Sequence, residues 1–578
     1  MALVSNERNA LARPRAFAWR WETQTILCTL VLGILAFVVL YPLVLLLISS
    51  FQLEVPGREP RFGLEGWGMA LSEPAIGRAI WNTISLTIAR QAIGFPIAIL
   101  LAWLLARTNL PGKNWLEFLF WVGYFLPSLP VVLGWILLLD PQYGLLNKAV
   151  IWLFALDSSP FNIYTWWGIV WAHLMANTIE VKVMLLTTAF RNMDASLEES
   201  SWMAGASPFR TLVRIVVPVM TPAILVVLLI SVIRSLEAFE IELILGSPQR
   251  IDVYSTLIYR LINQEEPQFA AATALSVLTL GLMLPLIVLQ RWVVGKRHYT
   301  TITGRYRGQP LSLGRWRWPA FFLVATIAAF LTVVPVSFLA VGTFMRLFGF
   351  FELAQPWTLN QWRTILGDPL FLSSLWNTIG LGLGSAVFSV VFFSVVAYIT
   401  ARTSFWGRGA IDILSWVPWA LPGIILGLGY LWLFLGTPFL RPLYGTMLIL
   451  ILVSVFSHMT LSVQIIRSSM LQLGFDLEEA SWISGGTWWY TMRRVILPIL
   501  VPSLVLVAVM NFIAAARSIS SLALLVTSQT RPLALLQLDY MAGGRYEAAS
   551  VVGLIVVMLT VGIAFVARAL GLRLGLQS

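Results

Sequence analysis

The chain has 578 residues, of which 58% are hydrophobic and only 11% are charged. A soluble domain typically carries about 25% charged residues, so a soluble globular protein is excluded, and the many aromatic and branched apolar residues exclude a disordered chain. The composition is that of an integral membrane protein. The formal net charge of +11 needs no nucleic-acid partner, because the basic loops of a membrane protein meet anionic lipid headgroups.

Twelve apolar segments are long enough to cross a bilayer, which takes about 20 helical residues. The first, 26–50, has no cleavage site after it and is predicted to be a retained helix and not a signal peptide. It contains Cys28, the single cysteine, which can form no intrachain disulfide. The predicted spans of this all-α membrane fold are 26–50, 79–106, 115–139, 166–190, 218–245 and 269–294, then 319–345, 375–401, 410–435, 445–470, 498–527 and 546–570.

The basic residues indicate the orientation of these spans. With segment 1–25 in the cytoplasm, the inside segments hold 23 Lys and Arg residues and the outside segments hold 11, although the outside segments are longer in total. This excess follows the positive-inside rule and predicts that both termini are cytoplasmic. The basic segment 295–318 is predicted to be a cytoplasmic linker between two membrane halves.

The two halves contain an internal repeat. Because each half has an even number of spans, the halves share one orientation, and the expected symmetry is a pseudo-twofold axis along the membrane normal. The offset between matched residues changes from 295 to 280, which places about 15 extra residues in the outside loop 140–165. At an offset of 295, Trp81-Asn82-Thr83-Ile84 matches Trp376-Asn377-Thr378-Ile379, Ala106-Arg107-Thr108 matches Ala401-Arg402-Thr403, Pro127 matches Pro422 and Gly134 matches Gly429. At an offset of 280, Leu197-Glu198-Glu199 matches Leu477-Glu478-Glu479, Gly205 matches Gly485, Pro218 matches Pro498 and Pro222 matches Pro502.

The most specific motif follows the fourth span of each half, on the predicted cytoplasmic side. The first copy reads Glu199-Ser200-Ser201, three residues, Gly205, nine residues, Ile215, one residue, Val217-Pro218. The second reads Glu479-Ala480-Ser481, three residues, Gly485, nine residues, Val495, one residue, Leu497-Pro498. This pattern resembles the cytoplasmic loop of the permease subunits of type I ATP-binding-cassette importers, E-A-A-x3-G-x9-I-x-L-P, and it occurs twice.

The resemblance covers about 79–294 and 375–570, which are the two expected permease domains. The segments 26–50 and 319–345 remain as accessory transmembrane helices. It implies a location in the bacterial inner membrane, two copies of a cytoplasmic ATPase as partners, and a periplasmic or extracellular substrate-binding protein. Glu199, Gly205, Glu479 and Gly485 are the residues that it assigns to docking on the ATPase.

Local sequence rules give a physical reading of the same loop. Ser196 and Asp476 each precede a Glu by three residues, which predicts a capping box at the start of a short helix. Gly205 and Gly485 are expected to let the chain bend between two short helices. Pro218 and Pro498 are expected where the next span begins, because a missing N–H has no cost there.

The sequence contains no candidate enzyme site. No glycine-rich phosphate loop ends in Gly-Lys-Ser/Thr, so ATP hydrolysis is expected on another polypeptide and no cofactor is expected. His173 and His458 lie in the fourth spans, but two histidines without a carboxylate or thiol beside them are a weak set of metal ligands. Hydrogen-bonded packing is the favoured interpretation of both.

Charged residues inside spans are costly and mark candidate functional positions. They are Arg90, Glu180, Lys182, Arg234, Glu237, Glu240, Glu242 and Arg517. For Glu180 and Lys182 the favoured interpretation is a structural charge pair with neighbours such as Arg90. Arg234, Glu237 and Glu240 are spaced three residues apart and share a helix face. Glu237 and Arg517 match at the offset of 280, so they are candidates for a gate across the translocation path, while pairing of Glu237 with Arg234 inside one half is the favoured alternative.

The sequence therefore predicts a fused permease that supplies both halves of an importer channel. Among fused permeases of this size, the resemblance is greatest to those for iron(III), with thiamine and aminophosphonate permeases as alternatives. An alternative from another class is an ion-coupled secondary transporter with six plus six spans. That class predicts a basic, glycine-containing signature between the second and third spans, which Arg107–Lys113 does not supply.

Overall fold

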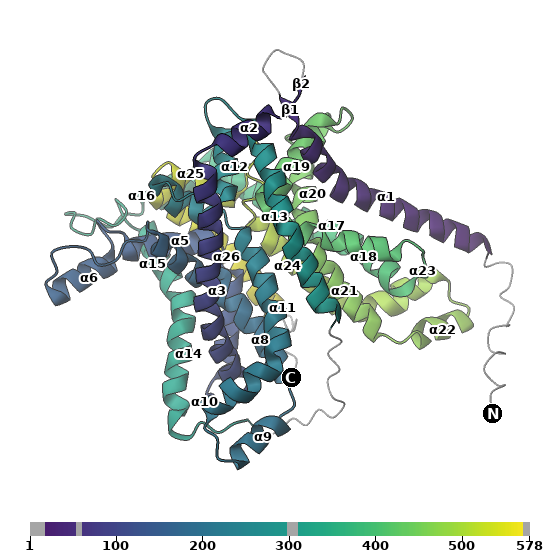
Figure 1. Ribbon diagram of the computed structural model, residues 1–578, viewed down its shortest axis with the longest axis horizontal. Helices are drawn as coiled ribbons and strands as arrows, with labels where there is room; N and C mark the ends of the chain where they lie inside the picture. Colours follow the sequence, from purple (N-terminus) through teal and green to yellow (C-terminus); the bar gives the residue numbers. More distant parts are fainter. Residues whose placement is uncertain (1–17, 54–60, 297–309, 570–578) are drawn as a thin grey trace.

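The structure is a computed structural model that describes residues 18–53, 61–296 and 310–569 (Figure 1). The predicted N-terminal segment 1–25 and the linker 295–318 fall partly outside these residues. A two-stranded antiparallel hairpin joins the first two helices, and the other described residues are helical or irregular apart from two isolated β-bridges, Thr108–Leu311 and Met345–Trp357. The elements of the first half are α1 (Ala18–Ser49), β1 (Gln52–Leu53), β2 (Arg61–Phe62), α2 (Glu65–Ser72), α3 (Ala75–Arg107), α4 (Lys113–Phe125), α5 (Ser128–Leu139), α6 (Leu145–Phe154), α7 (Trp166–His173), α8 (Ile179–Arg191), α9 (Ser196–Met203), α10 (Pro208–Thr211), α11 (Val217–Leu236), α12 (Tyr254–Asn263) and α13 (Phe269–Lys296).

The second half repeats this order of elements. Among the described residues it lacks a helix corresponding to α6, and the single antiparallel bridge Met345–Trp357 stands where the first half has its hairpin. Its helices are α14 (Arg317–Leu331), α15 (Val333–Thr343), α16 (Asn360–Leu366), α17 (Pro369–Arg402), α18 (Arg408–Trp416), α19 (Gly423–Gly436), α20 (Met447–Ser457), α21 (Met459–Gln472), α22 (Asp476–Ile483), α23 (Trp488–Thr491), α24 (Leu497–Ala516), α25 (Leu533–Ala542) and α26 (Tyr546–Ala569).

The helices confirm an all-α membrane fold. Within the described residues, 8 helices are long and apolar enough to cross a bilayer, and the number rises to 11 when each of three bent pairs is taken as one span. These 11 coincide with predicted spans, and the remaining predicted span, 269–294, coincides with α13. The helices of the fifth spans end earlier than predicted, at Leu236 and Ala516. The apolar runs continue past these ends, into the π-helical turn Glu242–Gly246 in the first half and an irregular segment in the second, which hydropathy cannot distinguish from the span helix.

The predicted third spans, 115–139 and 410–435, are not straight helices. The angle between α4 and α5 is 101°, and the angle between the helical segment Arg408–Ala420 and α19 is 114°. Each bend falls at a matched proline, Pro127 or Pro422, which lacks the N–H that would continue the helix and forces the residue before it out of the helical region. α5 and α19 are thereby turned into the interior of the protein.

Each accessory helix packs against the opposite half. α1 contacts α18 and α19, whereas α14 and α15 contact α4 and α5. The matched glycines permit this close approach: a Cβ on Gly134 would lie 2.1 Å from the Pro335 carbonyl oxygen in α15, and one on Gly429 would lie 3.2 Å from Pro42 Cβ in α1. The exchange of accessory helices ties the two halves together.

The repeated Trp-Asn-Thr-Ile motif lies at the start of the second span in both halves. Asn82 Nδ2 donates to the Asp252 carbonyl oxygen at 3.0 Å, and Asn377 Nδ2 donates to the Gln529 carbonyl oxygen at 2.8 Å. The two threonine hydroxyls accept from the first backbone N–H of α12 and of α25. The tryptophans, Trp81 and Trp376, are 69% and 70% exposed, as expected of side chains at the level of lipid headgroups. The motif therefore fixes the loop after each fifth span.

Candidate functional site: the repeated loops and the interface between the halves

The first candidate coupling loop is a helix, a left-handed turn and a short second helix. Gly205 has φ +81°, and the N–H groups of Gly205 and Ala206 bond back to the Trp202 and Ser201 carbonyls at 2.8 and 3.1 Å. This is the Schellman pattern, in which a glycine satisfies the last carbonyls of α9. Ser201 Oγ then contacts Thr211 Oγ1 at 2.9 Å, which holds α9 against α10.

The second loop has the same geometry. Gly485 has φ +82°, and the N–H groups of Gly485 and Gly486 bond to the Trp482 and Ser481 carbonyls at 3.0 and 2.8 Å. Ser481 Oγ contacts Thr491 Oγ1 at 2.8 Å. The bend expected at both glycines is therefore present, and only a residue without a Cβ adopts its backbone conformation without strain.

The predicted capping boxes are wrong. Ser196 and Asp476 are the first helical residues of α9 and α22 and not their N-caps, and neither helix has a side-chain cap at its N-cap position. In the first loop, Asp194 Oδ1 accepts from the Ser196 N–H at 2.9 Å, and this hydrogen bond lowers the pKa of the exposed Asp194 carboxyl. The side chain that accepts a backbone hydrogen bond at the start of this loop is therefore Asp194, two residues before Ser196, which the capping-box spacing selects.

Buried ion pairs attach both loops to the second span. Arg107, at the end of α3, donates to Glu198 Oε2 from Nε at 2.7 Å and also from Nη2. Arg402, at the end of α17, lies 3.4 Å from Glu478 Oε1, where burial raises the pKa of the Glu478 carboxyl and Arg402 opposes the rise. Both glutamates are almost fully buried.

Sequence reasoning missed these two pairs. It selected the neighbouring Glu199 and Glu479, which are less buried than Glu198 and Glu478. The signal was present, because the Ala-Arg-Thr repeat has a matched arginine and the Leu-Glu-Glu repeat has two matched glutamates, all on the same predicted side of the membrane.

The loops present matched apolar side chains to solvent. Met203 and Ile483, at an offset of 280, are 91% and 87% exposed. Phe209 and Trp489, at the same offset, are 69% and 66% exposed. Figure 1 shows α9 and α10 at the foot of the first half and α22 and α23 at the corresponding end of the second, well apart from each other. Each half thus has one exposed apolar surface of its own on its repeated loop.

The predicted contact between Glu237 and Arg517 is not formed. Glu237 pairs instead with Arg234 in its own half, with Oε2 and Nη1 2.8 Å apart, which was the favoured alternative. No ion pair joins Glu237 to Arg517 among the residues that the structure describes. Both are nevertheless matched in position, since each is the C-cap residue of its fifth-span helix, α11 or α24.

Arg517 instead reaches across to the first half. Its Nη1 donates to the Tyr124 carbonyl oxygen at 2.6 Å, and its guanidinium lies 5.2 Å from the centre of the Tyr124 ring. In the opposite direction, the Arg234 guanidinium lies 5.7 Å from the centre of the Trp419 ring in the second half. Tyr124 and Trp419 match at the offset of 295, immediately before the two proline bends. An arginine from each fifth span therefore covers the matched aromatic residue of the other half.

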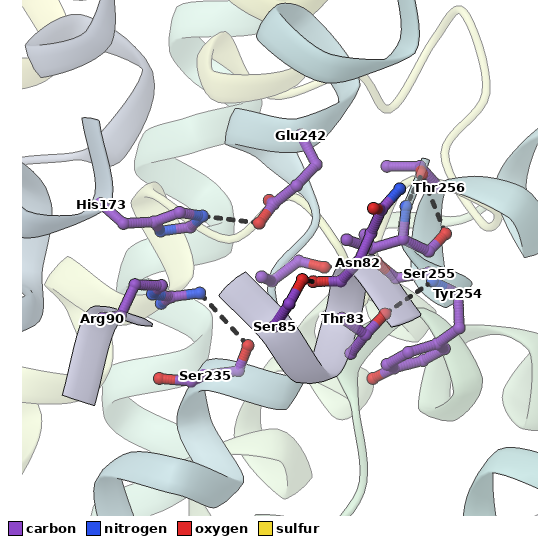
Figure 2. A network of polar contacts seen from close by, with 12 residues as sticks. Asn82, Thr83, Ser85, Arg90, His173, Ser235, Glu242, Tyr254, Ser255 and Thr256 are labelled. Atoms are coloured by element: carbon purple, nitrogen blue, oxygen red, sulfur yellow. Dashed lines mark hydrogen bonds and ion pairs between the residues drawn. The ribbon is translucent and has the colours of Figure 1, made fainter. Parts of the chain in front are cut away.

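A second group of buried charges lies wholly inside the first half. Figure 2 shows His173 and Glu242 facing each other, with His173 Nε2 and Glu242 Oε1 2.6 Å apart. Arg90 Nη1 donates to the Ser235 carbonyl oxygen at 3.3 Å in the same network (Figure 2). The prediction of hydrogen-bonded packing is correct for His173, and His458 Nδ1 contacts the Ser454 carbonyl oxygen at 2.9 Å.

Glu180 and Lys182 do not form the expected charge pair. Lys182 Nζ donates to the Thr178 carbonyl oxygen at 3.0 Å and lies over the Phe95 ring. Among the described residues, no side chain donates a hydrogen bond to either Glu180 oxygen, and the Glu180 side chain lies against Gly123 near the bend of the third span. Within the described residues, neither makes an ion pair with Arg90.

Known proteins share this organisation. The family described as binding-protein-dependent transport system inner membrane component matches residues 94–299 and 393–575. The ferric transport system permease protein FbpB of Actinobacillus pleuropneumoniae is 28% identical over 545 residues, covering 91% of this chain and 75% of the relative. The probable ABC transporter permease protein y4fN of Sinorhizobium fredii is 28% identical over 467 residues, covering 77% and 79%.

Shorter relatives match a single half. The sulfate transport system permease protein CysW of Escherichia coli is 28% identical over 208 residues, covering 34% of this chain and 65% of the relative. A solved bacterial ABC transporter for the import of alginate has a TM-score of 0.41 at 22% identity, covering 49% of this chain and all of that one. The two family matches, each containing one copy of the repeated loop, show that the chain belongs to the inner membrane components of binding-protein-dependent transport systems, with two copies of the family domain in one polypeptide.

Proposed function

We propose that the chain alone forms the translocation path of an ATP-binding-cassette importer. Two copies of a cytoplasmic ATPase would dock on the loops, one on Met203 and Phe209 and the other on Ile483 and Trp489. A soluble substrate-binding protein would deliver cargo to the opposite face, with both termini of the chain in the cytoplasm. The observation that carries this proposal is the recurrence of one loop geometry at two matched positions.

We propose iron(III) as the substrate. Two relatives that extend over most of this chain are named ferric transport permeases, and both align across the two halves. Thiamine and aminophosphonate remain the alternatives. Family membership argues against an ion-coupled secondary transporter. The two exposed, rigid cytoplasmic loops also have no expected function in that class.

The gate proposed for the path includes Arg234, Glu237, Glu240 and Arg517. The contacts across the two halves revise how it closes: the arginines bind Tyr124 and Trp419 and not the matched carboxylate. Parting the halves would break both arginine contacts while leaving the Arg234–Glu237 pair intact. An isolated guanidinium at this depth is costly, so these contacts stabilise the closed path.

Reconstitution tests the function. The purified chain should form a complex with an ATPase in a ratio of one to two, and proteoliposomes should accumulate iron(III) only with ATP and the binding protein. The double substitution Gly205→Val and Gly485→Val forces a Cβ into the left-handed region, at a cost of about 1–2 kcal/mol per residue. It should abolish transport and weaken ATPase binding.

Gly544→Val is the matched control, because Gly544 has φ +72° with open space around it and lies in the loop between α25 and α26, at the other end of the spans from α22. It should leave ATPase binding unchanged. Normal ATPase binding and transport in the double variant would contradict the docking assignment. Accumulation of another substrate with intact ATPase dependence would contradict iron(III) alone.

A further inference from the structure

The extra residues of the first half form a helix of their own. α6 follows α5 after a short turn and precedes the fourth span, which begins with α7. In the second half, the corresponding segment between α19 and α20 contains only one turn of 3-10 helix, Arg441–Leu443. Figure 1 shows α6 at the edge of the molecule, projecting sideways from the helix bundle next to α5 and α15.

The base of α6 is firmly held. Asn147 is 1% exposed, and its Nδ2 donates to the Asp140 and Phe161 carbonyl oxygens at 2.9 Å each. Its Oδ1 accepts from the Phe161 N–H at 2.9 Å. The side chain of Asn147 therefore links Asp140, at the start of the inserted segment, to Phe161 near its end. Lys148 Nζ also pairs with Glu352 Oε1 at 2.9 Å, which joins the helix to the second half. The projection of α6 is therefore a fixed feature and not a loosely attached loop.

The far end of α6 is apolar and uncovered. Trp152, Leu153 and Phe154 are 85%, 66% and 65% exposed, and Leu156 beyond them is 40% exposed. No charged residue occurs between Lys148 and Asp157. Consecutive exposed side chains of this size are rare on a surface that faces water, because contiguous apolar patches are normally covered.

We propose that the tip of α6 is inserted into the lipid bilayer at the outer headgroup boundary. Three observations favour lipid as the occupant. The helix connects the third span to the fourth, on the side of the membrane that the basic residues predict to be outside. Tryptophan is the residue enriched at that level, and Trp81, Trp167 and Trp376 are exposed at the outer ends of neighbouring spans. Residues 149–156 carry no charge, and a charge there would be costly to insert into lipid.

Such an anchor would act on the third span of one half only. α6 follows α5 after the turn 140–144, and α5 packs closely against the other half, where Gly134 meets Pro335. A helix held in the interface resists displacement in proportion to the apolar area that it buries. The anchored α5 would then be the fixed element, and α19, which has no such helix, the mobile one.

Spin-label accessibility tests the proposal on the full chain. Cys28 is the only cysteine and is buried in an accessory helix, so Cys28→Ser gives a background for single labels. Leu153→Cys and, separately, Trp152→Cys would carry a nitroxide in nanodiscs of phosphatidylethanolamine and phosphatidylglycerol. Molecular oxygen concentrates in lipid and a nickel chelate in water. The oxygen-to-nickel accessibility ratio at both sites should be several-fold higher than at Ser158, an exposed residue just past the tip.

Val387→Cys supplies the reference for full lipid contact, because Val387 is 65% exposed in the middle of the α17 span. A ratio at residues 152 and 153 close to that of Val387 supports the proposal. A ratio equal to that of Ser158 overturns it and leaves the tip in water. Low accessibility to both reagents also overturns it, because the tip would then be covered by protein. Two label sites guard against one substitution that disturbs the helix.

Discussion

The two halves of this permease share a backbone plan but differ in the charges that they bury. The first half has Arg90, His173, Glu180, Lys182 and Glu242 inside its spans or at their ends. The matched positions of the second half hold Ser385, Val453, Thr460, Ser462 and Leu522, all buried and all uncharged. Because the second half folds into the same arrangement without them, the charges of the first half are an addition and not a requirement of the fold.

The network around Glu242 should give the largest effect on stability. Removing one member of a buried pair leaves an uncompensated charge and typically costs about 3–5 kcal/mol. Glu242→Leu alone, which would leave His173 and Arg90 facing an apolar side chain, should lower the thermal unfolding temperature in detergent sharply. The triple substitution Arg90→Ser, His173→Val and Glu242→Leu installs the residues of the second half and should recover most of that loss.

Transport measured on the same variants separates the two roles of the network. If the triple variant is stable but inactive, the charges serve the transport cycle. If the triple variant is as unstable as Glu242→Leu, the comparison between the halves fails. The uncharged residues of the second half would then be stable only among the other residues of that half.

The anchors of the coupling loops should differ in the same direction. Glu198 accepts from two nitrogens of Arg107, whereas Glu478 lies 3.4 Å from Arg402 without a well-formed hydrogen bond. Glu198→Gln should therefore release the first loop, detected as faster hydrogen exchange over α9 and as reduced transport. Glu478→Gln should have a smaller effect.

The pH dependence of the Glu478 anchor has a definite sign. Because burial raises the pKa of Glu478 in the folded chain, the folded state binds its proton more tightly than the unfolded state does. Its contribution to stability is therefore present at low pH and is lost as the pH rises through the raised pKa. Glu478→Gln should remove this dependence, and stability that instead fell on acidification through the same window would contradict it.

Much of this architecture was predictable from the sequence, and the exceptions have physical causes. Hydropathy located the spans, and self-comparison located the loops with Gly205 and Gly485, because a left-handed turn needs a specific residue type. Hydropathy could not show that the third spans bend at Pro127 and Pro422, since an apolar residue scores the same on either side of a turn. The contact of Arg517 escaped prediction because its partners are a backbone carbonyl and an aromatic ring in the other half.

The cross-half arginines should differ in strength. Arg517 donates a short hydrogen bond as well as covering Tyr124, and hydrogen bonds to charged groups contribute about 1.5–3 kcal/mol. Arg234 is half-exposed and covers Trp419 without such a bond, and cation–π contacts at exposed sites contribute about 0.5–1 kcal/mol. Arg517→Ala should loosen the closed state more than Arg234→Ala, measured as ATPase activity in the absence of the binding protein.

Tyr124→Phe is the control for this pair. It keeps the ring and the backbone carbonyl that Arg517 uses, so it should leave that uncoupled activity unchanged. A Tyr124→Phe variant as active as Arg517→Ala would indicate that the hydroxyl, and not the cross-half contact, matters.

The smallest effect is expected at the starts of α12 and α25, where matched ion pairs have opposite polarity. α12 and α25 coincide at an offset of 279, and Asp252 pairs with Arg260 at 2.5 Å where Arg531 pairs with Asp539 at 2.7 Å. Both pairs span one helix start and include partly exposed side chains, so each should contribute between zero and about 1 kcal/mol.

Reversing the second pair with Arg531→Asp and Asp539→Arg keeps an ion pair and should leave the unfolding temperature nearly unchanged. The reversal also gives both halves the polarity of the first. If the two pairs serve only stability, transport should be unchanged as well. If a soluble partner distinguishes the two halves by their charge, transport should fall, and the loss should shrink at high salt, because screening weakens interactions between exposed charges.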